Sequence, residues 1–76
     1  MRVTIIGAGA GGAAAVAELT QAGHEVKLWN RSPETLAPFQ RIGGVEYEGV
    51  LGEGLARPRL MTSDLEAALQ GCEVIV

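Results

Sequence analysis

Three glycines near the start of the chain have the spacing of a phosphate-binding turn. Gly7, Gly9 and Gly12 fit the pattern G-x-G-x-x-G. Gly7 would let the chain leave a strand in a tight turn, Gly9 would let a pyrophosphate approach the backbone, and Gly12 would let a helix lie close to that strand. The first turn of the helix would present free N–H groups and a partial positive charge to the phosphates. The pattern predicts a dinucleotide-binding site, and tight helix–strand packing is the alternative use of these glycines.

The residues around the glycines form the elements that such a site needs. The apolar run 3–6 is typical of a strand buried on both faces of a parallel sheet. A helix is predicted to follow the turn and to end at Gly23, and residues 26–29 are predicted to form a second strand. The helix face predicted to lie against the sheet consists of Gly12, Ala15, Val16, Leu19 and Ala22.

Polar residues at the end of the second strand bear on the choice of cofactor. An Asp or Glu at this place bonds the ribose hydroxyls of NAD and repels the extra phosphate of NADP. This chain has Asn30, which removes the repulsion, and Arg31, whose guanidinium can pair with the 2′-phosphate and stack on adenine. Ser32 can add a hydroxyl donor. The sequence therefore predicts NADP ahead of NAD, and NAD is the alternative if Arg31 is only a solvated charge. The predicted cofactor-binding residues are Gly7, Ala8, Gly9, Ala10, Gly11, Gly12, Asn30, Arg31 and Ser32.

A second helix and an irregular excursion are predicted after the polar tip. Ser32 is expected to be the N-cap of a helix that starts at Pro33 and runs to about Arg41. Pro38 lies inside this helix and predicts that it is brief or irregular. Residues 45–54 alternate and contain several glycines, so they predict a small hairpin or an extended excursion.

The last part of the chain returns to the sheet. Residues 60–62 predict a third strand, and residues 73–76 predict a fourth. Ser63 and Glu66 have capping-box spacing, so Ser63 is predicted to be the N-cap of a helix over residues 64–70. Together the elements predict an α/β fold, namely the N-terminal half of a Rossmann-type doubly wound parallel sheet.

Length and composition bound the domain and the class of protein. The 76 residues are half of a fold of this type, so residues 1–76 are expected to be the N-terminal part of a dinucleotide-binding domain, with the substrate domain outside this sequence. A net charge of −3 without a basic stripe argues against nucleic acid as a partner, and no apolar run approaches the roughly 20 residues of a membrane span. The single cysteine, Cys72, excludes an internal disulfide and favours a cytoplasmic location.

Four other side chains that could do chemistry receive structural interpretations. His24 lies in the predicted helix-to-strand turn, and Cys72 is expected to be a small buried hydrophobe. Trp29 is expected to pack at the strand end, and the role of Tyr47 in the excursion stays open. No group of His, Cys and Asp residues has metal-ligand spacing, so no metal site is predicted. The catalytic residues are not identified within this segment.

These patterns resemble a known group of enzymes. The run IIGAGAGGAAAVAELTQAGHEVKLWNRSPE, residues 5–34, is similar to the N-terminus of two-domain dehydrogenases related to 6-phosphogluconate dehydrogenase. That group includes glycerol-3-phosphate, ketopantoate, 3-hydroxyisobutyrate and opine enzymes. Residues 43–45, 48–49, 52–54 and 60–68 are similar to the opine dehydrogenase branch. One departure is that some opine enzymes carry an acid where this chain has Asn30.

The resemblance implies an NADP-linked, opine-type dehydrogenase as the leading function. Such enzymes reductively condense an amino acid with a 2-oxo acid, taking hydride from the nicotinamide, and their catalytic His or Lys would lie in a helical second domain. The implied partners are these small molecules, with no nucleic acid and no membrane, and a homodimer is left open. The alternatives are reduction of the ketopantoate or glycerol-3-phosphate dehydrogenase type, or an NAD(H)-sensing module without catalysis. The segment alone is expected to be inactive.

Overall fold

The structure is a computed structural model that describes residues 1–48 and 52–76. Residues 49–51, which belong to the predicted excursion, lie outside the described residues. The elements in chain order are β1 (Arg2–Ile6), α1 (Ala10–Gln21), β2 (Glu25–Trp29), α2 (Pro33–Ile42), β3 (Val45–Tyr47), β4 (Gly54–Ala56), β5 (Leu60–Thr62), α3 (Leu65–Leu69) and β6 (Val74–Ile75). Their succession confirms the predicted order of strands and helices.

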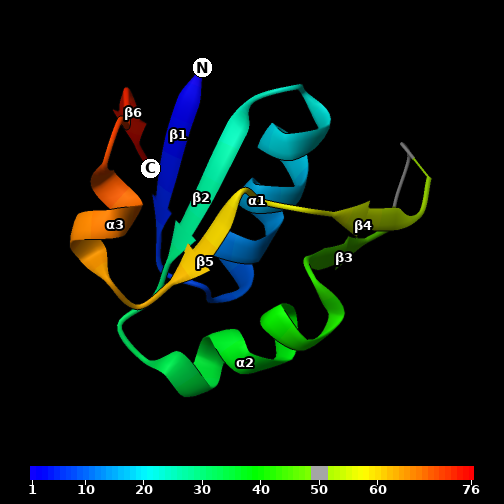
Figure 1. The fold of residues 1–76 in the computed structure, drawn as a ribbon. Coiled ribbons are helices and arrows are strands. Elements are labelled where there is room, and N and C mark those ends of the chain that lie inside the picture. Colours follow the sequence, from blue (N-terminus) through cyan, green and yellow to red (C-terminus); the bar gives the residue numbers. More distant parts are fainter. Residues whose placement is uncertain (49–51) are drawn as a thin grey trace.

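Four strands form a parallel sheet in the order β5-β2-β1-β6 (Figure 1). The first strand of the chain therefore lies inside the sheet, with β2 on one side and β6 on the other. Each pair of parallel strands is connected through a helix, as parallel pairing requires. The predicted fold is confirmed: this is the N-terminal part of a Rossmann-like α/β sheet.

The core lies between the sheet and α1. The register pairs Val3 with Val26 and Ile5 with Leu28, so these four side chains share one face of the sheet. All four are at most 4% exposed, and Val16 of α1, which is fully buried, belongs to the same cluster. Burial of such side chains contributes roughly 1.5–3 kcal/mol each relative to leaving them in water. This packing fixes α1 against β1 and β2, and with it the turn between β1 and α1.

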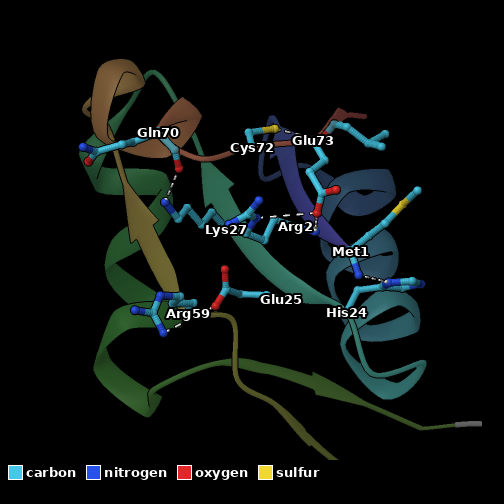
Figure 2. Close-up of polar contacts among 10 residues, drawn as sticks. Met1, Arg2, His24, Glu25, Lys27, Arg59, Gln70, Cys72 and Glu73 are labelled. Atoms are coloured by element: carbon cyan, nitrogen blue, oxygen red, sulfur yellow. Dashed lines mark hydrogen bonds and ion pairs between the residues drawn. The ribbon is translucent and has the colours of Figure 1, made fainter.

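The opposite face of the sheet binds α3 through polar contacts. Thr4, which alternates with Val3 and Ile5 on β1, is buried and donates from Oγ1 to the carbonyl oxygen of Ala68 at 2.6 Å. Lys27 on β2 donates from Nζ to the carbonyl oxygen of Gln70 at 2.8 Å (Figure 2). A cation at the C-terminal end of a helix also complements the helix dipole. Helices α1 and α3 thus cover opposite faces of the sheet.

Helix α1 ends at the predicted glycine. Gly23 has a φ of 93°, in the left-handed region, and its N–H donates to the Thr20 carbonyl oxygen at 3.1 Å. The N–H of His24 donates to the Leu19 carbonyl oxygen at 3.1 Å. This pair of bonds is the Schellman arrangement, in which a glycine follows the last helical turn. The prediction that Gly23 stops the helix is confirmed.

The predicted sheet-facing side of α1 is correct except at its end. Val16 is buried, and Ala15 and Leu19 pack against the core. The prediction that Ala22 faces the sheet was wrong, because Ala22 is the C-cap residue and its side chain is exposed. Ala17, which the predicted face omitted, is buried instead. Strands β3 and β4 also pack against α1, so the sheet is not the only element that covers this helix.

Helix α2 starts at Pro33 and ends within one residue of the predicted Arg41, but it is more regular than predicted. It runs without a break over ten residues although Pro38 lies inside it, so the expectation of a brief or irregular element was wrong. A proline removes one backbone hydrogen bond and crowds the preceding turn. Here Leu36, which is 1% exposed, and Phe39 anchor the helix to the core on both sides of Pro38. Gly43 then ends the helix in the left-handed conformation with a φ of 82°.

The excursion between α2 and β5 is a two-stranded antiparallel hairpin, β3–β4, beside α1 (Figure 1). Of the two predicted alternatives, the hairpin is confirmed. Val45 is buried in the core cluster, which joins the hairpin to the main sheet through α1. Gly44 is required at the start of β3, because a Cβ there would lie 2.3 Å from the Ala56 carbonyl oxygen.

Helix α3 has a different N-cap from the one predicted. Asp64, not Ser63, occupies the N-cap position, and its Oδ1 accepts from the N–H groups of Glu66 and Ala67. The capping-box prediction for Ser63 was therefore wrong. The cause is local: the Asp64 N–H donates to Thr62 Oγ1 at 3.0 Å, which turns the chain and aims the Asp64 carboxylate at the first turn.

Ion pairs connect the strands at the edge where they begin (Figure 2). Glu73 Oε1, just before β6, accepts from the Arg2 N–H at 2.9 Å and lies 3.5 Å from Arg2 Nε. Arg59 Nη1, just before β5, lies 3.5 Å from Glu25 Oε1 on β2. These pairs are exposed, and such pairs contribute little individually. They join strand starts that the backbone pairing of the sheet already places side by side.

A pH-dependent contribution to stability is expected from Glu73. The Arg2 N–H, together with the positive charges of Arg2 and the amino terminus, holds the pKa of the Glu73 carboxyl below its usual value of about 4.5. Because the pKa is lower in the folded state, the stabilisation is present above pH 4.5 and is lost as pH falls through the folded-state pKa. Glu73→Gln should therefore lower the Tm at pH 7, and the difference from the unsubstituted protein should shrink in acid. A difference that stays constant from pH 7 to the acid limit of folding would contradict this.

Candidate functional site

The turn after β1 needs glycine at its first position. Gly7 has a φ of 106°, a conformation that side chains with a Cβ rarely adopt. Its N–H donates to the Trp29 carbonyl oxygen at 2.8 Å, so β1 stays paired with β2 to its last residue. The chain then turns away from the sheet and enters α1. Gly7 thus has the turn conformation that its place in the pattern predicts.

Gly12 lies where α1 crosses the start of this turn. A Cβ on Gly12 would lie 1.8 Å from the Gly7 carbonyl oxygen and 2.9 Å from the Gly7 carbonyl carbon. Both neighbours are backbone atoms, which cannot rotate away. The predicted close approach of helix and strand is therefore present. Gly9 and Gly11 differ, because a Cβ on either would meet nothing within 4 Å, and both residues are exposed. The outer side of the turn is open.

The start of α1 carries unneutralised backbone donors. Gly9 is the N-cap and has no side chain to accept from the first turn, and that turn contains no acidic residue. The first intrahelical bond runs from the Ala13 N–H to the Gly9 carbonyl oxygen at 2.9 Å. The N–H groups of residues 10–12 precede that bond and, as at any α-helix start, have no acceptor within the helix. A helix start of this kind attracts anions, so its chemistry fits a phosphate.

Asn30 lies directly beside the turn. Its Oδ1 accepts from the Ala8 N–H at 2.9 Å, and its Nδ2 donates to the Ser32 carbonyl oxygen at 3.1 Å. Ala8 itself is buried, with 5% of its surface exposed. The Gly7 and Ala8 N–H groups are therefore both bonded within the protein. A phosphate at this turn would therefore have to be held by N–H groups further along the chain, such as those at the start of α1.

Arg31 and Ser32 follow at the tip of β2. The Arg31 side chain is exposed to solvent. Ser32 is the N-cap of α2, as predicted, but its hydroxyl does not cap the helix and instead donates to Glu34 Oε2 at 2.6 Å. This bond, with the backbone N–H of Glu34 itself, lowers the pKa of the Glu34 carboxyl. The Ser32 hydroxyl proton is thus engaged with Glu34.

The structure brings the two predicted groups of residues together. The glycine turn follows β1 and the polar tip follows β2, and these parallel strands are neighbours, so both groups lie at the carboxyl edge of the sheet. The Asn30–Ala8 hydrogen bond is the direct contact between them. Ligands in open α/β sheets bind at this edge. Among the described residues, no group of three or more His, Cys, Asp or Glu side chains could hold a metal ion.

Two residues set aside in the sequence lie far from this edge. His24 precedes β2 at the opposite edge, where its Nδ1 lies 3.3 Å from the Met1 amino group (Figure 2). Cys72 also lies near that edge, and its Sγ donates to the Val74 carbonyl oxygen at 3.0 Å. Cys72 is only partly buried, so the expectation of a buried hydrophobe was wrong. It precedes the short strand β6, whose exposed outer side leaves the thiol partly open to solvent.

Trp29 and Tyr47, the other two residues set aside in the sequence, lie outside the glycine turn. Trp29 donates from Nε1 to the Ser63 carbonyl oxygen at 3.0 Å, which holds the loop after β5 against the end of β2. Tyr47 lines a cavity of about 890 Å³ between the end of α2 and the hairpin. The cavity residues are Ile42, Glu46, Tyr47, Glu48, Glu53, Gly54 and Leu55. None of the predicted cofactor-binding residues lines it, so the candidate site is an open edge and not this cavity.

Glu34 was not included among the predicted site residues. Glu34 is the acidic residue in the first turn of α2, and its carboxylate accepts a hydrogen bond from the Ser32 hydroxyl. This contact could have been predicted, because Glu34 follows the serine N-cap by two residues and a side chain in the first turn can reach back to the cap.

In the described part of the chain, no helix is long and apolar enough to cross a membrane.

Comparison of the chain with known proteins finds a family and several relatives. The family model described as Ketopantoate reductase PanE/ApbA matches residues 3–76. A glycerol-3-phosphate dehydrogenase (NAD(P)+) of Mesorhizobium japonicum is 36% identical over 75 residues, covering 99% of this chain and 21% of the relative. An enzyme of the same name from Geobacter sp. is 35% identical, covering 99% and 22%. An opine dehydrogenase of Arthrobacter sp. is 33% identical over 72 residues, covering 95% and 20%.

These relatives are much longer than the chain, which spans about a fifth of their length. No solved structure matches it. The family model, in contrast, covers nearly the whole chain, including the glycine turn, the polar tip and the hairpin. The chain therefore belongs to the ketopantoate reductase PanE/ApbA family.

Proposed function

We propose that this chain is the cofactor-binding part of an NAD(P)-dependent oxidoreductase. The observation that carries the proposal is the glycine turn, in which Gly12 is pressed against Gly7 while the outer side of the turn stays open. The family membership and the relatives named as NAD(P)+ enzymes support the same conclusion. A bound nicotinamide would supply the hydride, so the role of these residues is to bind and orient the cofactor.

The pyrophosphate is assigned to the start of α1. The N–H groups of residues 10–12 are its proposed donors, because those of Gly7 and Ala8 are already bonded within the protein. The absence of a side chain at Gly9 lets a phosphate come close to the backbone.

NADP is the proposed cofactor in preference to NAD. The support is the charge at the tip of β2: Asn30 is neutral, and the guanidinium of Arg31 is exposed next to it. A guanidinium can hold a phosphate by two parallel hydrogen bonds. The Ser32 hydroxyl donates to Glu34, so it would have to leave Glu34 before it could donate to a 2′-phosphate. The predicted preference for NADP therefore depends mainly on Arg31.

The proposed substrate class is an amino acid together with a 2-oxo acid, as in opine formation. Its support is the similarity of residues 43–45, 48–49, 52–54 and 60–68 to that branch and the opine dehydrogenase among the relatives. The glycerol-3-phosphate dehydrogenases among the relatives and the name of the family make reduction of a phosphorylated ketone or of ketopantoate the competing possibilities. In each case the substrate domain and catalytic residues would lie outside residues 1–76. A cytoplasmic location is part of the proposal.

Parallel fluorescence titrations of the full-length protein with NADPH and NADH test the cofactor assignment. NADPH is expected to bind more tightly by about tenfold or more, which corresponds to one charge-assisted contact. Tighter binding of NADH would overturn the NADP preference. Binding of neither would overturn the oxidoreductase proposal.

The substrate is then identified by following oxidation of the preferred reduced cofactor with each candidate substrate in turn. The candidates are pairs of an amino acid and a 2-oxo acid, ketopantoate, and dihydroxyacetone phosphate. Opine chemistry predicts cofactor oxidation only when both members of a pair are present. Turnover with ketopantoate or dihydroxyacetone phosphate alone would replace the opine assignment. Cofactor binding with no turnover on any substrate would favour a nucleotide-sensing module.

A further inference from the structure

The side chain of Asn30 joins the glycine turn to the start of α2. It accepts from the Ala8 N–H at 2.9 Å and donates to the Ser32 carbonyl oxygen at 3.1 Å. Its backbone N–H donates to the Thr62 carbonyl oxygen at 3.1 Å, at the end of β5. One residue thus connects three segments at the carboxyl edge of the sheet: the turn after β1, the end of β5 and the N-cap of α2.

The two hydrogen bonds of the Asn30 side chain need an acceptor at one position of the planar amide and a donor at the other. The Ala8 N–H requires an acceptor and the Ser32 carbonyl oxygen requires a donor, and an amide offers both. An Asp carboxylate would satisfy the Ala8 N–H but would place a second acceptor against the Ser32 carbonyl oxygen. An amide at position 30 therefore has a structural reason that does not involve the charge of the cofactor.

We propose that Asn30 is a positioning residue that fixes the phosphate-binding turn relative to the segment Arg31–Ser32. The inference rests on the proposed function and deepens it. The contacts of Asn30 hold the parts of the site that would meet the pyrophosphate and the adenosine ribose, which NADH and NADPH share. Through these contacts Asn30 supports both nucleotides alike, and direct pairing with the 2′-phosphate is left to Arg31.

The test is Asn30→Ala in the full-length protein, with two readouts. Fluorescence titration should show that the affinities for NADH and NADPH both fall, each by roughly threefold to tenfold, as expected for losing neutral hydrogen bonds. Hydrogen exchange at the Ala8 amide, followed by NMR, should become faster relative to the amides of buried residues such as Ile5, because its acceptor has been removed. General destabilisation would instead speed exchange at both sites.

Two further variants complete the experiment. Asn30→Asp keeps an acceptor for the Ala8 N–H, so slow exchange at Ala8 should be restored. Gln40→Ala is the matched control, because it also removes an amide-to-backbone bond, from Gln40 Nε2 to the Met61 carbonyl oxygen at 2.9 Å, between α2 and β5. It should leave both nucleotide affinities and the Ala8 exchange unchanged.

The outcomes separate this inference from the function on which it rests. Unchanged Ala8 exchange in Asn30→Ala, or a loss of affinity for NADPH alone, would overturn the positioning role while leaving the proposed function intact. Failure of the unsubstituted protein to bind either nucleotide would overturn the proposed function, and with it the role of Asn30 toward the cofactor.

Discussion

Gly12→Ala should destabilise the protein by at least about 3 kcal/mol, beyond the usual cost of overpacking a core. The added Cβ would lie 1.8 Å from the Gly7 carbonyl oxygen and 2.9 Å from the Gly7 carbonyl carbon, and both are backbone atoms. Relief requires α1 to move away from β1, which would also separate Val16 from the core around Ile5. Thermal or denaturant unfolding of the full-length protein measures the loss. Titration should show weaker binding of NADH and NADPH together.

Gly11→Ala is the matched control for stability. A Cβ on Gly11 would meet nothing within 4 Å, and the residue lies in the first turn of α1 with ordinary helical geometry. Replacing glycine by alanine in a helix stabilises by roughly 0.5–1 kcal/mol. The same substitution at adjacent positions should therefore change stability in opposite directions. Equal effects at the two positions would show that the close approach of α1 to the turn is not the cause.

Arg31→Ala should weaken NADPH binding by about 1.5–3 kcal/mol, or roughly tenfold to 150-fold, while NADH binding changes little. Arg31 is exposed at the tip of β2, next to the neutral Asn30, and its guanidinium is the group that we propose pairs with the 2′-phosphate. NADH lacks that phosphate and loses no charge-assisted bond. The ratio of the two dissociation constants, from parallel titrations, is the quantity to measure.

Arg41→Ala separates this local effect from a change in overall charge. Arg41 is an exposed arginine in the last turn of α2, so its removal changes the net charge by the same amount at the other end of that helix. It should affect the two nucleotides equally. If Arg31→Ala also weakened NADH and NADPH equally, Arg31 would not select the cofactor, and the preference for NADP would lose its main support.

The fold could be predicted well from the sequence because its signals are local and strong. The apolar run before Gly7, the small-residue helix and the stop at Gly23 each depend on neighbouring residues, and all three are present. The errors occur where a distant or competing contact decides. Helix α2 passes through Pro38 because Leu36 packs into a core built by other strands. At α3, the side chain of Asp64 takes the N-cap position that the pattern gave to its neighbour.

The position of the candidate residues at one edge of the sheet was predictable from the sequence, but their hydrogen bonds were not. The spacing of the glycines indicates a tight turn, and the parallel pairing of β1 with β2 places Asn30 beside it. The sequence does not show which atoms of Asn30 are already occupied, because its partners are the backbone of Ala8 and Ser32. The same holds for the hydroxyl of Ser32, whose partner is Glu34. Side-chain hydrogen bonds to a folded backbone depend on conformation, which spacing alone does not fix.

The position of β1 inside the sheet has a consequence for synthesis on the ribosome. One neighbour, β2, follows soon after β1, but the other is β6, and Arg2 and Glu73 at their starts are 71 residues apart. At roughly 5–20 residues per second, the nascent chain would wait about 4–14 s before that second neighbour exists. During this interval β1 has an unpaired edge, which is a site for mispairing and aggregation. Slower translation between the hairpin and β6 would lengthen the exposure and should lower the yield of folded protein.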